Sequence, residues 1–421
     1  MRLPTALAPF QTRSYRFQWP ADLLTAWGLE METLILGWYV LVKTNSVLLL
    51  TVFGSLQFIG TLISPMIGVL GDRVGLRNVL TVMRVGYAMC AAALLSFAVA
   101  DSLEPNVVFV VAAISGLIRP SDIGIRSALV GTTIPPAHLV AAMGVSRTTQ
   151  DSARIAGALA GAGLIAAYGM ANAYMAITVI YLLGALLTTL VDRDPKPASA
   201  TQAGPAVSTA SMRPSPWRDL REGLTYVWRT PRLLAAMSLA ALVNLTAFPL
   251  TSGLMPYIAR NVFKLDQSGL GLMVASFATG AFIGSVALSI FGGKIQPARM
   301  MLAAAVAWYL ALLAFVMVES VPLAMLLLVV AGTAQSFSMV TLAIMLLRTS
   351  EERFRGRIMG VRMLAIYTLP IGLMGVGLMI PQFGYRATAL IMVVCGLLAT
   401  LEIAVSWRRH LIARDAVGNA G

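Results

Sequence analysis

Residues 68–80 read GVLGDRVGLRNVL, a short glycine-rich and charged stretch in a chain that is otherwise strongly apolar. Glycine lets two helices approach closely and lets the chain reverse sharply. An acid and two arginines beside such a turn can hold the end of a neighbouring helix and release it again, because a charge at a helix terminus contributes only about 0.3–1 kcal/mol. We interpret the stretch as a latch in a turn between two helices; the alternative is an ordinary basic turn. The residues of this gating motif are Gly68, Asp72, Arg73, Gly75 and Arg77.

The apolar background around this stretch indicates the class of protein. The chain has 421 residues, of which 58% are hydrophobic and 12% are charged, and its mean hydropathy is +0.80. Soluble domains carry about 25% charged residues. A helix needs about 20 apolar residues to cross a bilayer, and such runs recur along the whole chain. The short alternating segments of a membrane barrel do not occur. We therefore expect an all-α integral membrane protein.

The apolar runs predict twelve transmembrane helices arranged as two six-helix halves. The first half covers residues 1–191 and the second covers 233–421 with a short cytoplasmic tail. Residues 192–232 form a linker that is rich in Pro, Ala and Ser and ends in an amphipathic helix on the membrane surface. The predicted spans are 18–42, 47–70, 79–100, 107–131, 139–167, 172–191, 233–258, 268–291, 299–318, 321–347, 358–381 and 384–406.

Lysine and arginine are distributed unevenly between the two sides of the predicted membrane. If both termini are cytoplasmic, the cytoplasmic segments hold 21 of the 31 Lys and Arg residues and the outer segments hold four. Positively charged loops remain on the cytoplasmic side, so this distribution predicts cytoplasmic termini. It also explains the formal charge of +13 and the pI near 10.3 without a nucleic-acid partner. The expected partner is the lipid bilayer.

Four ionisable residues inside the first and fourth spans are candidates for a proton-coupling site or a substrate cavity: Glu30, Glu32, Arg119 and Asp122. Charged groups at this depth cost a few kcal/mol each and are functional candidates by default. Glu30 and Glu32 project about 200° apart on a helix, so only one of them can face a central cavity well. Asp122 fits either a cavity or a contact with Arg73 of the gating motif.

The fifth predicted span carries a triad of charges, Arg147, Asp151 and Arg154, at i, i+4 and i+7 on one helical face. A proton site is one interpretation. Because the acid is flanked by two bases, we favour a static structural charge network. Arg84, near the cytoplasmic end of the third span, is expected to extend its guanidinium towards the membrane surface.

The chemistry of metal sites and of most enzymes is poorly represented in this chain. Cys90 and Cys395 lie in apolar runs, which argues against a disulfide framework or a thiolate metal site. His138 and His410 fall in a loop and in the tail. No nucleotide-binding glycine loop with a lysine occurs, which argues against a transferase and against ATP-driven transport. A membrane sensor would need a further soluble domain, and no stretch is long enough. We expect the protein to bind no metal and no cofactor and not to be an enzyme.

The stretch 68–80 resembles the loop signature of the major facilitator superfamily, written G-x-L-[small]-D-R-x-G-R-[RK]-x-x-L. Leu76 stands where the family usually has a basic residue, and the equivalent loop of the second half, residues 292–299, lacks the acid. The resemblance implies that Asp72 contacts a helix of the other half and holds the cytoplasmic side closed, from one half only. The matching positions are Gly68, Leu70, Gly71, Asp72, Arg73, Gly75, Arg77 and Leu80.

Three further stretches are similar to the enterobactin-exporter-like and macrolide-efflux-like branch of that superfamily: REGLTYVWRTPRLL at 221–234, ERFRGRIMGV at 352–361 and ARIAGALAGAG at 153–163. The branch often has Gly-Pro in the fifth span, where this chain has Gly157-Ala158. The absence of that form weakens the inference of drug/proton antiport. Gly157, Gly161 and Gly163 still permit close helix packing.

The resemblance implies a secondary active transporter of the plasma membrane, the inner membrane of a bacterium, that works as a monomer by alternating access. The favoured function is proton-coupled export of an amphiphilic small molecule, drug-like or siderophore-like. The alternative is an importer or facilitator of a polar solute. The sequence leaves open the substrate, the direction of transport and the coupling ion.

Overall fold

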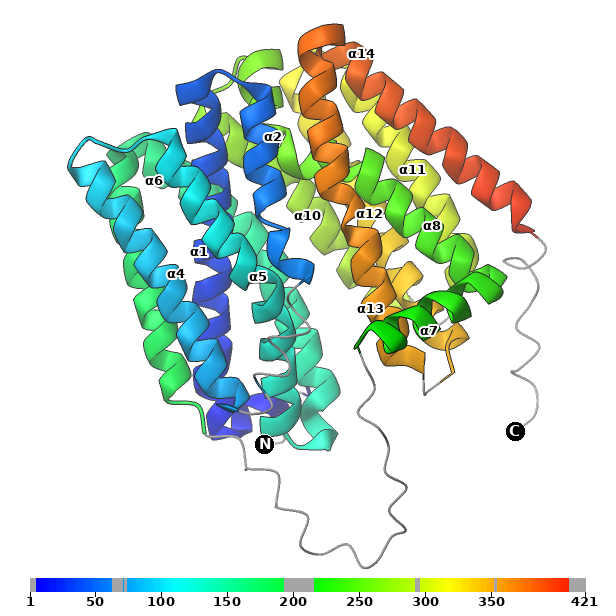
Figure 1. Cartoon of the computed structure of the whole chain (residues 1–421), viewed down its shortest axis with the longest axis horizontal. Helices are drawn as coiled ribbons and strands as arrows, with labels where there is room; N and C mark the ends of the chain where they lie inside the picture. The colour runs from blue at the N-terminus through cyan, green and yellow to red at the C-terminus, as the bar shows by residue number, and fades with distance from the viewer. Residues whose placement is uncertain are drawn as a thin grey trace, which may run out of the picture. The chain divides into compact units, whose positions relative to one another are not determined.

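In the residues that the structure describes, every regular element is a helix (Figure 1). The structure is a computed structural model, and it describes residues 5–62, 71, 74–192, 216–291, 296–351 and 354–408. The elements of the first part of the chain are η1 (Thr5–Gln11), α1 (Arg13–Thr44), α2 (Val47–Leu56), η2 (Ile59–Leu62), α4 (Leu76–Val99), α5 (Pro105–Thr133) and α6 (Pro136–Thr189).

The later part of the chain continues with helices of very different length. Two of them, η3 and η4, are short π-helical segments that follow α8. The elements are α7 (Pro216–Arg229), α8 (Pro231–Thr246), η3 (Pro249–Gly253), α9 (Met255–Tyr257), η4 (Ile258–Val262), α10 (Gln267–Phe291), α11 (Pro297–Met317), α12 (Val321–Thr349), α13 (Arg355–Ile366) and α14 (Thr368–Ser406).

Eight helices of the described residues are long and apolar enough to cross a membrane. In hydrocarbon each backbone N–H and C=O must be satisfied internally, and a helix does this within one segment. A shorter apolar helical segment occupies Val47–Thr61. The eight are Leu76–Val99, Pro105–Thr133, Ala141–Thr189, Pro231–Gly253, Gln267–Ile290, Pro297–Met317, Val321–Thr349 and Gly360–Ser406.

Glycines break the two longest helices. Gly169 in α6 has φ 76° and Gly384 in α14 has φ 78°, and neither value is helical. This left-handed region is open to glycine but costly for a residue with a Cβ. Gly169 lies between the predicted spans 139–167 and 172–191, and Gly384 begins the predicted span 384–406. Each of these long helices is therefore two helical arms joined at a glycine.

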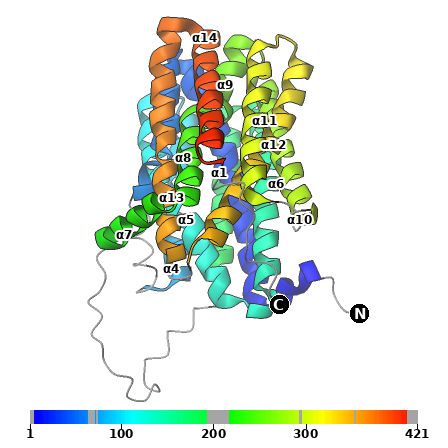
Figure 2. The same cartoon turned by 90° about the vertical axis from the view of Figure 1, so that its right-hand side faces the viewer.

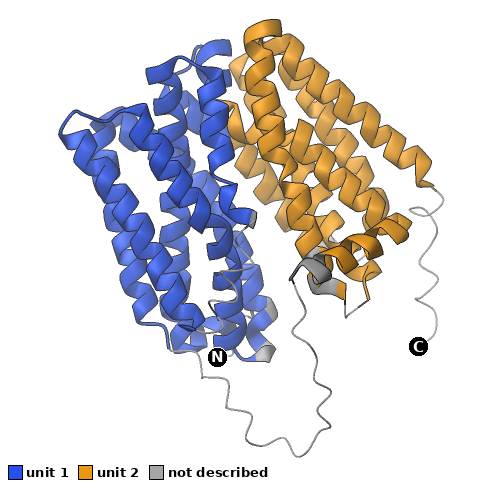
Figure 3. Cartoon of the chain, in the orientation of Figure 1, with its two compact units in different colours: residues 1–209, 256–275 blue, residues 210–255, 276–421 orange. Residues whose placement is uncertain are grey.

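The helices gather into two compact units (Figure 3). Unit 1 contains residues 1–209 and 256–275, and unit 2 contains residues 210–255 and 276–421. Unit 1 thus includes a short segment from the second part of the chain. Within it, the Arg260 guanidinium donates to the backbone carbonyl of Leu41, 3.0 Å away, near the C-terminal end of α1. A cation is favourable at this end of a helix.

Unit 1 is built around α1, which packs along α6, and α4, which also packs on α6. Gly157 and Gly161 of α6 face α1: a Cβ on Gly161 would lie 3.0 Å from the Cα of Met31. The sequence-based expectation of close packing is therefore confirmed for these two glycines. A Cβ on Gly163 would meet nothing within 4 Å, so Gly163 makes no such contact.

A glycine crossing also joins η2 to α5 in unit 1. A Cβ on Gly60 would come within 2.2 Å of the carbonyl oxygen of Leu117, and one on Gly116 within 2.1 Å of that of Leu56. Only glycine allows two backbones to approach this closely. The crossing brings the residue that follows α2 next to α5, which shapes the pocket described below.

Unit 2 contains a crossing of the same kind, between α10 and α12. A Cβ on Gly280 would lie 2.0 Å from the carbonyl oxygen of Val329, and one on Gly332 would lie 2.1 Å from that of Phe277. These two glycines follow Gly60 and Gly116 in the chain by 220 and 216 residues. The two units thus repeat one packing device at nearly constant spacing. Figure 2 shows α11 and α12 side by side in this unit.

Candidate functional site

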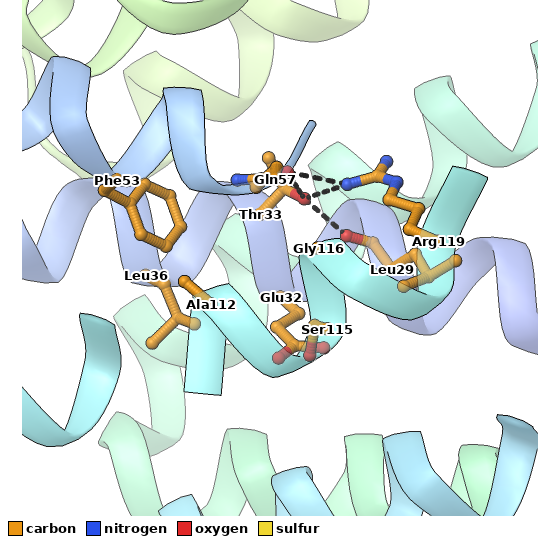
Figure 4. Close-up of a pocket in the computed structure, with 10 residues that line it drawn as sticks. All are labelled: Leu29, Glu32, Thr33, Leu36, Phe53, Gln57, Ala112, Ser115, Gly116 and Arg119. Carbon is orange, nitrogen blue, oxygen red and sulfur yellow. Dashed lines mark hydrogen bonds between the residues drawn. The ribbon is translucent and has the colours of Figure 1, made fainter. Parts of the chain in front are cut away.

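A pocket in unit 1 lies among α1, the end of α2 and α5 (Figure 4). It contains about 290 Å³ of space, part of it open to solvent. One side is apolar and the other carries a carboxylate, a guanidinium, an amide and two hydroxyls, a mixture typical of small-molecule sites. The lining residues are Leu29, Glu32, Thr33, Leu36, Phe53, Gln57, Ala112, Ser115, Gly116 and Arg119.

Arg119 of α5 organises the polar side of this pocket. One of its nitrogens donates to Gln57 Oε1 at 2.7 Å and to Thr33 Oγ1 at 3.0 Å (Figure 4). Gln57 can take part because the crossing at Gly116 brings the end of α2 against α5. The other terminal nitrogen lies 3.3 Å from Glu30 Oε1. Arg119 therefore connects the three segments that form the pocket.

Glu32 is the acid of the first predicted span that lines the pocket. It is buried, and its carboxylate accepts a hydrogen bond of 2.7 Å from the Tyr181 hydroxyl of α6. Tyr181 can lie across α1 because Gly28, one turn before Glu32, has no side chain: a Cβ there would sit 2.5 Å from the Tyr181 ring. The hydrogen-bond partner of Glu32 is thus a neutral phenol.

Glu30 occupies a different environment from Glu32. Its carboxylate lies between two arginines, 3.3 Å from Arg119 and 3.9 Å from Arg154, and a quarter of its side chain is exposed. The sequence predicts that only one of the two acids faces a cavity well without saying which. Glu32 is the one that lines the pocket, and Glu30 is held by the two arginines beside it.

Towards the start of α1, unit 1 contains a second group of charges around Asp22, a residue that the sequence did not single out. Asp22 forms an ion pair with Arg84 of α4, and Arg84 also donates to Thr188 of α6. The Arg84 side chain has no exposed area, so the expectation that it extends to the membrane surface is wrong. A carboxylate one helix away gives the guanidinium an internal partner. The signal available in the sequence was an aspartate inside the first predicted span.

Asp122 of α5 belongs to this second group and does not line the pocket. It is 1% exposed, and both Asp122 and Arg126 interact electrostatically with Asp22. Its Oδ1 atom has no hydrogen-bond partner among the described residues. The four candidates of the first and fourth spans are therefore divided: Glu32 and Arg119 line the pocket, Glu30 borders it, and Asp122 lies with the buried ion pair.

The charges of the fifth predicted span do not form one closed triad. Arg147 and Asp151 pair at 3.4 Å one turn apart on α6. Arg154 approaches Glu30 of α1 instead. About half of the side chain of each arginine is exposed, whereas Asp151 is buried. The expected network thus extends to a second helix.

The gating motif is described only in part, since Gly68, Asp72 and Arg73 lie outside the described residues. Gly75 precedes α4 with φ 95°, a left-handed conformation that requires glycine. Arg77 donates to the backbone carbonyls of Thr189 and Val191, at 3.2 and 2.9 Å, at the end of α6. Arg77 therefore caps a helix of its own unit.

Candidate metal ligands are sparse in this part of the molecule. Among the described residues, no group of three or more His, Cys, Asp or Glu side chains could hold a metal ion. Cys90 is buried, Cys395 is exposed, and both are free thiols. The acids in and beside the pocket have partners in Tyr181, Arg119 and Arg154 instead.

A multi-pass helical membrane protein with buried charges and a mixed polar pocket has the structural characteristics of a solute transporter. The family model of the Major Facilitator Superfamily matches residues 23–259 and 237–417. The chain therefore belongs to the major facilitator superfamily, and it is a multi-pass membrane transporter and not an enzyme.

Curated relatives indicate the branch. Macrolide efflux protein A of Streptococcus pyogenes is 24% identical over 283 residues, which cover 65% of this chain and 67% of that protein. Macrolide efflux protein A of Enterococcus faecalis is 25% identical over 246 residues, which cover 58% of this chain and 72% of that protein. The predicted resemblance to the macrolide-efflux-like branch is confirmed.

Solved structures share the fold over nearly the whole chain. The POT family transporter PepTSo superposes with a TM-score of 0.74 at 13% identity and covers 96% of this chain and 99% of its own. A bacterial homologue of the human lysosomal transporter Spinster superposes with a TM-score of 0.72 at 13% identity and covers 97% of this chain and 99% of its own. The nucleoside transporter NupG gives 0.69 at 13% identity, covering 94% and 99%. At these identities the likeness defines the fold alone.

Proposed function

We propose that the chain is a proton-coupled exporter of an amphiphilic small molecule, drug-like or siderophore-like, that works by alternating access. Both curated relatives are macrolide efflux proteins, which supports the direction of transport. The observation that carries the proposal is Glu32: it is buried, lines the pocket and contacts a phenol rather than an arginine. A carboxyl in such a place can exist in both its neutral and its charged form.

The proposed topology is twelve spans in two halves with both termini in the cytoplasm. The glycine breaks divide two of the eight long apolar helices into two arms each. The eight helices thus provide ten proposed spans, and α1 and the Val47–Thr61 segment bring the number of proposed spans to twelve. The repeated glycine crossing supports a duplication of six spans. Inverted or parallel repeats of this kind underlie many secondary transporters.

In the proposed mechanism Glu32 and the substrate compete within one pocket. Glu32 takes up a proton when the pocket opens to the acidic side and loses it when the substrate enters from the other side. Arg119 holds Thr33 and Gln57 in place through both states. Glu30, which lies between Arg119 and Arg154, balances part of their positive charge beside the pocket. The transported molecule and the proton thus never occupy the pocket together.

The test is proton-linked efflux in inside-out vesicles that have an acidic lumen. A panel of amphiphilic compounds, including a macrolide and a siderophore, is added while a dye reports the luminal pH. We expect a compound that releases protons from the lumen in the wild type and in Glu30→Gln, but not in Glu32→Gln. Coupling that persists in Glu32→Gln and in the double variant would exclude these acids as the proton site.

The second candidate is an importer or facilitator of a polar solute. It is favoured by the polar side of the pocket, where Gln57, Thr33 and Arg119 present hydrogen-bonding groups. If no amphiphile releases protons and the protein is folded, uptake of polar solutes in right-side-out vesicles becomes the next measurement. Uptake that is independent of the pH gradient would identify a facilitator.

The gating motif is proposed to close the cytoplasmic side through Asp72. Replacing this acid with asparagine should slow turnover and leave the affinity for substrate nearly intact, because the latch acts on the opening step. A large loss of affinity at normal turnover would contradict the latch. We propose that the protein works as a monomer in the bacterial inner membrane, which size-exclusion chromatography with light scattering would test.

A further inference from the structure

Helix α7 lies across the end of α8, to which a single residue, Thr230, connects it (Figures 1 and 2). The helical segment that starts with α8, Pro231–Gly253, is long and apolar enough to cross the membrane. A helix that joins the end of a span at an angle stays at the membrane boundary, where one side meets protein and the other meets headgroups. The side chains described in α7 are those from Arg221 onward.

One face of α7 is held by the protein. Glu222 pairs with Arg357 of α13 at 2.8 Å, and the Tyr226 ring stacks on that of Phe354 at 4.4 Å between centroids. Val227 is buried, and a Cβ on Gly223 would lie 3.1 Å from Arg357 Cβ. The one acid among the described side chains of α7 is thus committed to an arginine on α13.

The opposite face of α7 is exposed among the residues that the structure describes. Trp228 is 71% exposed and Leu224 is 46% exposed. The residues of this outer face recur at i, i+3, i+4, i+7 and i+8, which is one side of a helix. We define the outer face as Arg221, Leu224, Thr225, Trp228 and Arg229, all of them exposed.

The chemistry of the outer face fits the surface of a membrane. Tryptophan is enriched at the level of the headgroups, where its ring is half in apolar and half in polar surroundings. Arginine can lay its methylene groups along acyl chains and extend its guanidinium to phosphate oxygens. Glu222, the one acid among the described side chains of α7, pairs with Arg357, and the exposed Arg221 and Arg229 place two positive charges on the outer face.

We propose that the outer face of α7 binds the anionic phospholipid headgroups of the adjacent leaflet. Each arginine near an anionic leaflet contributes favourable binding free energy, and the two act on the same helix. One face of α7 contacts α13 and the opposite face contacts the headgroups. Lipid binding to the outer face therefore also stabilises the position of α7 on α13. The occupant is lipid rather than protein because the face is continuous with the end of a membrane-spanning helix. This inference is independent of transport.

The test is hydrogen exchange of the full-length protein in nanodiscs. One set of discs contains phosphatidylcholine and the other contains in addition about 30 mol% phosphatidylglycerol. We expect the amides of residues 221–229 to exchange about tenfold more slowly in the anionic discs, a difference that about 0.5 M salt reduces. Equal exchange of the wild type in the two discs would overturn the proposal.

Two charge-matched variants separate a local site from a general effect of charge. The double variant Arg221→Glu, Arg229→Glu should lose the difference between the discs. The double variant Lys43→Glu, Lys264→Glu changes the net charge equally at two exposed positions of unit 1 and should keep it. If the control variant also loses the difference between the discs, the effect is general and the proposal fails.

Trp228→Ser tests the apolar part of the contact. This variant should speed exchange in both discs, and unchanged exchange would exclude the apolar part of the contact.

Discussion

The guanidinium of Arg84 and the carboxylate of Asp22 form an ion pair in the interior of unit 1, with 0% and 7% of their side chains exposed. The pair joins α4 to α1, and Thr188 of α6 accepts a further hydrogen bond from the arginine. Three helices are thereby connected through one side chain. Removing one partner of such a pair leaves an uncompensated buried charge.

Arg84→Leu should therefore lower the free energy of unfolding by about 3–5 kcal/mol. The measurement is thermal or denaturant unfolding of the purified protein in detergent. The double variant Arg84→Leu, Asp22→Asn should recover much of the loss, because no unpaired charge remains.

A surface pair provides the control for this prediction. Arg386 and Glu319 lie 3.6 Å apart with 56% and 87% of their side chains exposed. Arg386→Leu should change the stability by less than about 1 kcal/mol. Equal effects of Arg84→Leu and Arg386→Leu would show that the interior pair does not behave as a buried one.

Gly28→Ala should destabilise unit 1 and disturb the contact between Tyr181 and Glu32. The added Cβ would lie 2.5 Å from the Tyr181 ring, which is fully buried. Overpacking of this kind costs about 1–3 kcal/mol. The measurement is the unfolding midpoint in detergent. Gly163→Ala is the matched control, because nothing lies within 4 Å of its Cβ, and its stability should be unchanged or slightly higher.

Arg77→Gln should loosen the end of α6. The two carbonyls that Arg77 caps would lose a charged donor, and hydrogen bonds to charged groups contribute about 1.5–3 kcal/mol. We expect the amides of residues 185–191 to exchange faster by at least about tenfold. Asn78→Ala is the control, since it changes the next position, which is exposed and bonds only within its own segment. Equal exchange rates of the amides of residues 185–191 in the two variants would show that Arg77 does not cap α6.

Arg119→Gln should weaken substrate binding while the protein remains folded. The shorter amide cannot reach Thr33, Gln57 and Glu30 together, so the polar side of the pocket loses its centre. Binding of the compound identified in the vesicle assay should weaken by at least about tenfold. Arg147→Gln, on α6 and outside the pocket lining, should bind normally. Similar losses in the two variants would point to a general effect of charge.

The sequence alone was sufficient for the membrane class, the family and the positions of most helices. Apolar runs near the length of a bilayer crossing are a local property that no distant contact alters. The break at Gly169 and the left-handed Gly75 follow from glycine at those positions. The signature at 68–80 identified the superfamily that the family model confirms.

The partners of the charged residues were decided only by the tertiary structure. Helical periodicity places Asp151 between Arg147 and Arg154, yet Arg154 contacts Glu30 of α1. Arg84 was expected at the membrane surface, yet it is buried against Asp22. A side chain selects its partner from whichever helix packs against its own, and periodicity along one helix contains no information about the neighbour.

The same limit applied to Glu30 and Glu32. Their angular separation on a helix shows that the two side chains project in different directions. Which of them lines a pocket depends on where α5 and α6 meet α1. That geometry is set by contacts between glycines and their neighbours on different helices, such as Gly116 against Leu56 and Gly28 against Tyr181. The sequence by itself determined a transporter with acids inside its first span. Only the packing of three helices decided that Glu32 is the acid in the pocket.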